Sequence, residues 1–221
     1  MSWYRCDISS GGGGGPITPT FTETLICDNS SVSNTLTFTE DWHDYDFLKF
    51  KLSNSSSGII TYITTTPDII DEIFTISSSK ILFNEYCNTQ YATYTESSDP
   101  LIWTRRIQRN VDVIEVKGLT ATNCTVSTEW IYKRGSISPD ATTVITSPHN
   151  FESYDEIYVA TCDNDSDDTM PCILPVKGGT LAACNHYNNY HGIRLVGNTA
   201  TDTYGKSETQ YIFAMMGVNY I

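Results

Sequence analysis

The residues best suited to chemistry gather in two segments rich in tyrosine and amide side chains, residues 84–94 and 185–191. In the second segment, His186 and His191 lie five positions apart, where they can coordinate a metal or hydrogen-bond and stack on sugars. We favour sugars, because tyrosine and asparagine give contact area and adaptable hydrogen bonds at little entropic cost. Ordinary polar loops or packing between subunits are the alternative. The residues that we expect to bind a ligand are Tyr86, Tyr91, Tyr94, His186, Tyr187, Tyr190 and His191.

A further candidate is the acidic run Asp-Asn-Asp-Ser-Asp-Asp at residues 163–168, because alternating side-chain oxygens can bind calcium. An EF-hand loop requires glycine at its sixth position and glutamate at its twelfth, and here these are Asp168 and Leu174. The seven cysteines contain no C-x-x-C pair of the kind that holds structural zinc, and we expect them to be reduced. We therefore expect a solvated hairpin tip at this run, and no metal or cofactor.

The motifs of common catalytic machinery are missing from the sequence. It contains no G-x-S-x-G, no glycine loop leading to Lys-Ser/Thr and no H-E-x-x-H. Its four histidines do not single out a Ser-His-Asp set. We expect no enzyme. A pair of glycosidase carboxylates is defined in space and not by sequence spacing, so a polysaccharide-degrading enzyme stays open as an alternative.

Charge and hydrophobicity exclude further classes. Asp and Glu outnumber Lys and Arg by 26 to 13, and the net charge of −13 would repel the phosphates of a nucleic acid. No window approaches 18 consecutive apolar residues, and the N-terminus has no apolar segment like that of a signal peptide. We therefore expect a soluble protein made in the cytoplasm, with no nucleic-acid partner and no insertion into a membrane.

The segments that must position these side chains have the pattern of short strands. Residues 35–39 and 111–116 alternate with period two, and turn clusters rich in serine and asparagine separate such segments. No stretch of 12 residues sustains a helical period, and residues 66–72 predict at most a single turn, with Thr66 as N-cap and Pro67 at the first position. The chain is therefore predicted to be all-β, with antiparallel β-sandwiches.

An internal repeat divides the chain. A segment of the form aromatic-x-x-Tyr-Asp-x-aliphatic-x-apolar occurs twice, 109 positions apart, and a closing segment recurs at a shorter offset, residues 114–119 matching residues 213–218. The matched pairs are Tyr45 with Tyr154, Asp46 with Asp155, Leu48 with Ile157 and Phe50 with Val159. We expect the two aspartates to accept backbone N–H bonds, which is a structural role.

The repeat predicts two tandem β-sandwich modules, residues 21–133 and 134–221. Residues 1–20 form a separate N-terminal anchor and tether, because the five glycines at residues 11–15 cannot hold a fixed conformation by themselves. Modules of this size bury a limited core, so we also expect a homo-oligomer.

The N-terminus resembles a known family. The chain begins Met-Ser-Trp-Tyr-Arg-Cys, and a glycine run follows closely. This start resembles the N-termini of tail or virion structural proteins of tailed bacteriophages and prophages of gut bacteria. The resemblance covers residues 1–15, and the rest of the chain is similar only in style, through β-rich modules with a Tyr-Asp-x-aliphatic strand. The chain departs from the family by the insertion of residues 7–10 before the glycines, and it is short for a tail fibre.

The resemblance implies a virion protein, most directly a surface or tail-appendage protein that contacts a glycan or protein receptor on the bacterial host. A head-decoration or tail-cementing protein without a ligand is the alternative. The resemblance also implies a homotrimer with other virion proteins as partners. Trp3, Tyr4 and Arg5 have the residue types that anchor interfaces, and we expect them to attach the chain to the virion; a frayed terminus is the alternative.

Overall fold

The computed structural model of the protein describes residues 17–76, 81–84, 91–133, 144–163, 169–174, 179–184, 190–202 and 210–221. These residues form sixteen strands, one α-helix and two 3-10 turns, which confirms the all-β, sandwich-like fold that the sequence predicts. No helix in these ranges is long and apolar enough to cross a membrane. The strands of the first half are β1 (Phe21–Asp28), β2 (Thr35–Thr37), β3 (Phe47–Asn54), β4 (Ile60–Thr65), β5 (Ile81–Asn84), β6 (Tyr91–Glu96), β7 (Ile102–Gln108) and β8 (Val111–Ala121).

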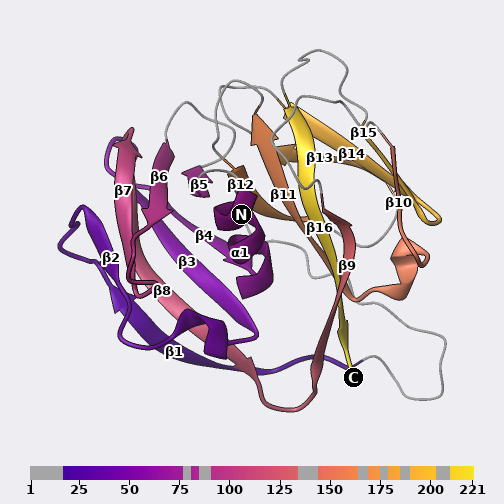
Figure 1. Ribbon diagram of the computed structural model, residues 1–221, viewed down its shortest axis with the longest axis horizontal. Coiled ribbons are helices and arrows are strands. Elements are labelled where there is room, and N and C mark those ends of the chain that lie inside the picture. The colour runs from indigo at the N-terminus through magenta and orange to yellow at the C-terminus, as the bar shows by residue number, and fades with distance from the viewer. Residues whose placement is uncertain are drawn as a thin grey trace.

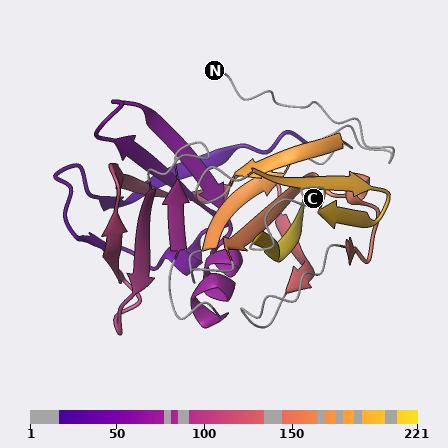
Figure 2. The same cartoon turned by 90° about the horizontal axis from the view of Figure 1, so that it is seen from above.

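The second half repeats the topology of the first, strand for strand. Its strands are β9 (Val126–Lys133), β10 (Val144–Thr146), β11 (Glu156–Asp163), β12 (Thr169–Leu174), β13 (Gly179–Cys184), β14 (Tyr190–Val196), β15 (Thr199–Asp202) and β16 (Gln210–Tyr220). In the first sandwich the sheet β1-β8-β3-β4 packs on β2-β7-β6-β5, and in the second the strands β9-β16-β11-β12 pack on β10-β15-β14-β13. Figure 1 shows the two sandwiches side by side, and Figure 2 shows the same arrangement from above.

The repeat boundary differs from the predicted one. β9 takes the place in the second sandwich that β1 takes in the first, since each lies beside the last strand of its own sandwich. The strand order therefore indicates a boundary in the turn at residues 122–125, between β8 and β9, and not after residue 133. The sequence of β9 shows where a strand lies, but it does not show that the partner is β16, 80 or more residues further on.

The two sandwiches share structure and are not separate bodies. β5 and β12 meet in parallel at the pair Ile81 and Thr169, which joins two four-stranded layers into one eight-stranded sheet. Within the half of this sheet that belongs to the second sandwich, the strands β11 and β16 are buried on both faces. Along β11, Ile157 and Val159 pack into the second core, whereas Tyr158 and Ala160 pack into the first.

The helix α1 (Pro67–Ile76) fills the space between the sandwiches (Figure 1). It is inserted between β4 and β5, where the second half has only residues 175–178, and this insertion explains why the closing segment recurs at a shorter offset. Thr66 caps it as predicted, since its Oγ1 accepts a hydrogen bond from the N–H of Ile69 at 3.3 Å. The helix is longer than the predicted single turn, because Ile70 and Ile73 are buried between the two halves and burial stabilises a short helix.

The repeated aspartates hold the ends of the closing strands. Asp46 Oδ2 accepts a hydrogen bond from the backbone N–H of Ala121, at the end of β8, at 2.8 Å. Asp155 Oδ2 accepts the matching bond from Tyr220, at the end of β16, also at 2.8 Å. The Tyr-Asp segment recurs because each sandwich fastens its last strand with the same contact.

The repeated tyrosines explain why a glycine recurs in the closing segment. A Cβ atom added at Gly118 would lie 2.3 Å from the ring of Tyr45, and one added at Gly217 would lie 2.3 Å from the ring of Tyr154. Real Cβ atoms do not approach other atoms so closely, so the position under each tyrosine ring must be a glycine.

Candidate functional site

The described structure places some of the predicted ligand-binding residues. Tyr91 and Tyr94 lie in β6 with exposed fractions of 2% and 0%, so neither ring lies on the surface. Tyr190 and His191 begin β14, the strand that corresponds to β6 in the second sandwich. The remaining predicted residues lie outside the described ranges, namely Tyr86, His186 and Tyr187 of the binding segments and Trp3, Tyr4 and Arg5 of the anchor.

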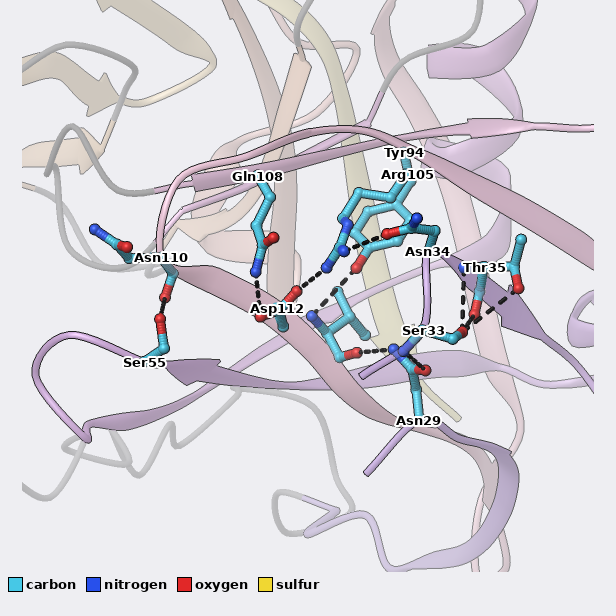
Figure 3. Close-up of polar contacts among 11 residues, drawn as sticks. Asn29, Ser33, Asn34, Thr35, Ser55, Tyr94, Arg105, Gln108, Asn110 and Asp112 are labelled. Atoms are coloured by element: carbon cyan, nitrogen blue, oxygen red, sulfur yellow. Dashed lines mark hydrogen bonds and ion pairs between the residues drawn. The ribbon is translucent and has the colours of Figure 1, made fainter. Parts of the chain in front are cut away.

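A buried polar network lies instead at one end of the first sandwich, and sequence reasoning missed it (Figure 3). Arg105 of β7 donates hydrogen bonds from its guanidinium to Asp112 Oδ1 on β8 and to Asn34 Oδ1. Gln108 Nε2 donates to the other carboxylate oxygen of Asp112 at 2.7 Å. The side chains of Arg105 and Asp112 are only 11% and 6% exposed, so this ion pair is largely shielded from water.

Tyr94 belongs to the support of this network. Its hydroxyl oxygen accepts a hydrogen bond from the backbone N–H of Val113 at 3.4 Å. On the other side of Val113, the backbone carbonyl accepts a bond from Asn29 Nδ2 at 2.8 Å, and Asn29 Oδ1 accepts one from the N–H of Ser33, also at 2.8 Å. Burial raises the pKa of Tyr94 to about 12, so its hydroxyl stays protonated at physiological pH.

The network holds two surface turns, and a separate hydrogen bond joins a third turn to them. The buried Asn29 opens the turn before β2, and Arg105 binds the last residue of that turn, Asn34. The β7–β8 turn meets the β3–β4 turn, where the N–H of Ser55 donates to the carbonyl of Asn110 at 2.8 Å. The hydroxyl of Ser55 donates to the same carbonyl at 3.3 Å (Figure 3). A surface whose turns are held by hydrogen bonds to a shielded ion pair and to one another is preorganised for binding. We call this surface, residues 29–34, 54–58 and 105–110, the loop end of the first sandwich.

The loop end carries a local concentration of positive charge. Arg105, Arg106 and Arg109 are three of the 13 Lys and Arg residues, in a chain with a net charge of −13. Arg106 and Arg109 are exposed; Arg106 Nε donates to Thr95 Oγ1 at 3.1 Å, and the guanidinium of Arg109 lies 5.3 Å from the ring centroid of Tyr91. Of the predicted tyrosines, Tyr91 thus lies beneath Arg109. The density of cations at 105–109 was the sequence signal that could have identified this end.

A second polar cluster joins the first sandwich to α1. The imidazole of His43 contacts Asp41 Oδ1 through Nδ1 at 2.6 Å and Asp71 Oδ1 of α1 through Nε2 at 3.1 Å, and the ring of Trp42 stacks on it. Burial acts to lower the pKa of His43, but the hydrogen bonds to the two carboxylates outweigh it and raise the pKa above the ordinary value. Glu96 faces the same cluster, and its pKa is raised by burial and by Asp71.

This cluster predicts a stability that depends on pH. The folded-state pKa of His43 lies above the unfolded value of 6.5, so its contribution is present below about pH 6.5 and is lost as pH rises through the folded pKa. The side chain is 38% exposed, so the effect is small. His43→Gln is expected to lower the melting temperature by about 1–2 °C near pH 5.5 and by less near pH 8.

The matched control is His149→Gln, because the ring of His149 is 61% exposed and contacts a single carboxylate, that of Glu129, at 3.6 Å. Thermal denaturation of both variants and of the wild type at the two pH values gives the comparison. An equal pH dependence of the two variants would contradict the role of the two carboxylates around His43.

The residues that the structure describes contain no group of three or more His, Cys, Asp and Glu side chains that could hold a metal ion. Most of the acidic run at 163–168 lies outside those residues, since only Asp163 at the end of β11 is described. Cys27 and Cys124 are free thiols.

Comparisons with known proteins add no assignment. A scan against models of protein families finds none that matches the chain, and a search of curated proteins finds no significantly similar sequence.

Proposed function

We propose that the chain is a virion surface or tail-appendage protein of a tailed bacteriophage that contacts a glycan or protein on the bacterial host. The loop end of the first sandwich is the surface that makes this contact. The observation that carries the proposal is a set of three turns from distant parts of the chain. The shielded pair of Arg105 and Asp112 holds two of them through Asn34 and Gln108, and the hydrogen bond of Ser55 to Asn110 joins the third. Binding residues are commonly placed on loops that a rigid scaffold positions, as they are here.

The loop end suits a ligand with hydrogen-bonding groups and some negative charge. Its exposed side chains include serines, amides and the two arginines Arg106 and Arg109, which supply donors and positive charge, together with the apolar Val32 and Ile107. In the sequence, Tyr86 precedes β6, and His186 and Tyr187 precede β14, the strand that corresponds to β6 in the second sandwich. They belong to the proposal as a second contact of the same kind. The N-terminal resemblance supports virion attachment through Trp3, Tyr4 and Arg5, and assembly as a homo-oligomer.

The test removes the two exposed arginines. The double variant Arg106→Ala/Arg109→Ala is expected to weaken binding to host cells, or to a glycan array that identifies the ligand, by at least about tenfold, because bonds to charged groups contribute about 1.5–3 kcal/mol each. The melting temperature should change little, since both side chains are exposed. Arg194→Ala is the matched control, because Arg194 is an exposed arginine of the second sandwich.

Equal binding by the double variant and the control would contradict a host contact at the loop end. If the double variant also destabilised intact particles, the alternative of a head-decoration or tail-cementing protein without a ligand would replace the proposal.

A further inference from the structure

The turn before β2 holds a valine in a strained backbone conformation. Val32 has a φ of 52°, in the left-handed region that residues with a branched Cβ rarely adopt. Its N–H donates to the carbonyl of Asn29 at 2.8 Å, and Asn29 Oδ1 accepts a bond from the N–H of Ser33. The buried Asn29 therefore sets the geometry of this turn, and a valine in it costs stability.

The side chain of Val32 does not offset this strain by packing in the core, because it is 41% exposed. Glycine and asparagine adopt a positive φ more easily. They do so in the other two turns of the loop end, where Gly58 has a φ of 72° and Asn110 a φ of 62°. A strained residue whose side chain faces solvent indicates a role outside the fold, and at this position that role is contact with a ligand.

Each of the three turns presents one exposed aliphatic side chain. Val32 lies in the first turn, Ile107 in the β7–β8 turn is 36% exposed, and Ile59, which directly follows the β3–β4 turn, is 51% exposed. Hydrogen bonds between the turns hold all three at the same end of the sandwich, through Arg105 to Asn34 and through Ser55 to Asn110. The loop end therefore offers apolar contacts as well as hydrogen bonds.

Branched aliphatic side chains suit a protein ligand better than a sugar. A sugar stacks its apolar face on an aromatic ring, and the sequences of the three turns contain no aromatic residue. Of the tyrosines in β6, Tyr91 and Tyr94 are 2% and 0% exposed, so neither ring can receive a sugar. Exposed apolar side chains among polar ones are typical of sites that bind another protein.

Charge indicates the character of that protein. The three turns contain three arginines and no acidic residue, in a chain with a net charge of −13. Arg106 and Arg109 are exposed, and arginine is among the residues most enriched at protein interfaces. Complementary charge steers association, so the matching surface is acidic.

We propose that the loop end binds a protein on the host surface, at an acidic patch that includes apolar side chains. Val32, Ile59 and Ile107 form the apolar part of the contact, and Arg106 and Arg109 bind the carboxylates around it. The inference rests on the proposed host contact, and it decides between the glycan and the protein that the contact allows.

The first test treats the surface of the host cells before the full chain is added. Protease, removed by washing, is expected to lower the amount of bound chain by at least about tenfold, because it destroys a protein ligand. Periodate, which oxidises the vicinal diols of sugars, should leave binding unchanged within about twofold.

The second test removes the aliphatic side chains. Val32→Asn and, separately, Ile107→Ser are expected to weaken binding to untreated cells by at least about fivefold, because each loses a buried apolar contact. The melting temperature of Val32→Asn should stay the same or rise, since asparagine enters the left-handed region more easily than valine. Val196→Asn is the control, because Val196 is 58% exposed and lies at the end of β14 in the other sandwich.

The outcomes separate this inference from the proposed function. No binding of the wild-type chain to untreated cells contradicts both. If untreated cells bind the chain and Arg106→Ala/Arg109→Ala weakens that binding, the host contact stands; loss of binding after periodate, or its survival after protease, then overturns the protein ligand alone. Equal binding by Val32→Asn and Val196→Asn would also overturn it.

Discussion

Asp112→Ala is expected to lower the free energy of unfolding by about 3–5 kcal/mol, because it leaves the guanidinium of Arg105 buried without its carboxylate. The side chain of Arg105 is only 11% exposed, so water cannot replace the lost partner fully. Gln108 Nε2 loses its acceptor as well. Urea denaturation followed by tryptophan fluorescence measures the change, because Trp103 is buried in the core of the same sandwich.

Two further variants test whether the loss comes from leaving Arg105 buried without a partner, and not from the loss of an ion pair as such. Arg105→Met/Asp112→Leu removes both charges, and it is expected to cost much less than Asp112→Ala, since a buried pair replaced by apolar groups leaves no charge without a partner. Glu23→Ala removes the carboxylate between Lys49 and Lys117, where the side chain of Glu23 is 37% exposed. That change is expected to cost no more than about 1 kcal/mol. A loss for Asp112→Ala as small as that for Glu23→Ala would contradict the shielding of the pair.

The duplication could be predicted from sequence because its signature is local contacts with fixed residue types. In both sandwiches, the ring of the tyrosine lies over the backbone of the closing strand, which requires a glycine there. In both, the carboxylate of the aspartate accepts a hydrogen bond from a backbone N–H at the end of that strand. The partner of a strand is not such a local property. The alternating pattern of β9 would fit a pairing with either sandwich, so the boundary could not be read from it.

The length of α1 and the role of the tyrosines escaped prediction for a related reason. A helix of ten residues is marginal alone, and α1 is stabilised by contacts with both halves of the chain. The richness of residues 84–94 in tyrosine and amides is typical of binding loops, but Tyr91 and Tyr94 are buried in β6, whose first five residues are all buried. Composition shows which residues can bind a ligand, and only the fold shows which of them face solvent.

The two sandwiches differ most where the repeat makes them correspond. Tyr158 and Ala160 on β11 are buried against the first sandwich, and the residues at the corresponding places on β3 are Lys49 and Lys51. Likewise Met216 on β16 corresponds to Lys117 on β8. The outer face of β11 and β16 is therefore apolar, because the first sandwich covers it. The corresponding face of β3 and β8 carries lysines, because it meets solvent.

Gly217→Ala is expected to lower the free energy of unfolding by about 1–3 kcal/mol, because the added methyl group would lie 2.3 Å from the ring of Tyr154. Tyr154 is 2% exposed and its hydroxyl donates to Glu129 Oε2 at 2.8 Å, so the ring cannot move aside without breaking that bond. Urea denaturation of the purified variant measures the loss.

Gly118→Ala is the matched control within the same chain. The added Cβ would also lie 2.3 Å from a ring, that of Tyr45. The hydroxyl of Tyr45 donates to Glu40, but Glu40 is exposed and Tyr45 is only partly buried, so the ring and its partner can move toward solvent together and a smaller loss is expected. A second control tests the clash itself: in the Gly217→Ala background, Tyr154→Ala should cost less than in the wild type, because the ring that collides is gone. Equal costs of Tyr154→Ala in both backgrounds would show that the glycine is not required by the ring, and the shared Tyr-Gly contact would then fail to explain why both closing strands keep a glycine at this position.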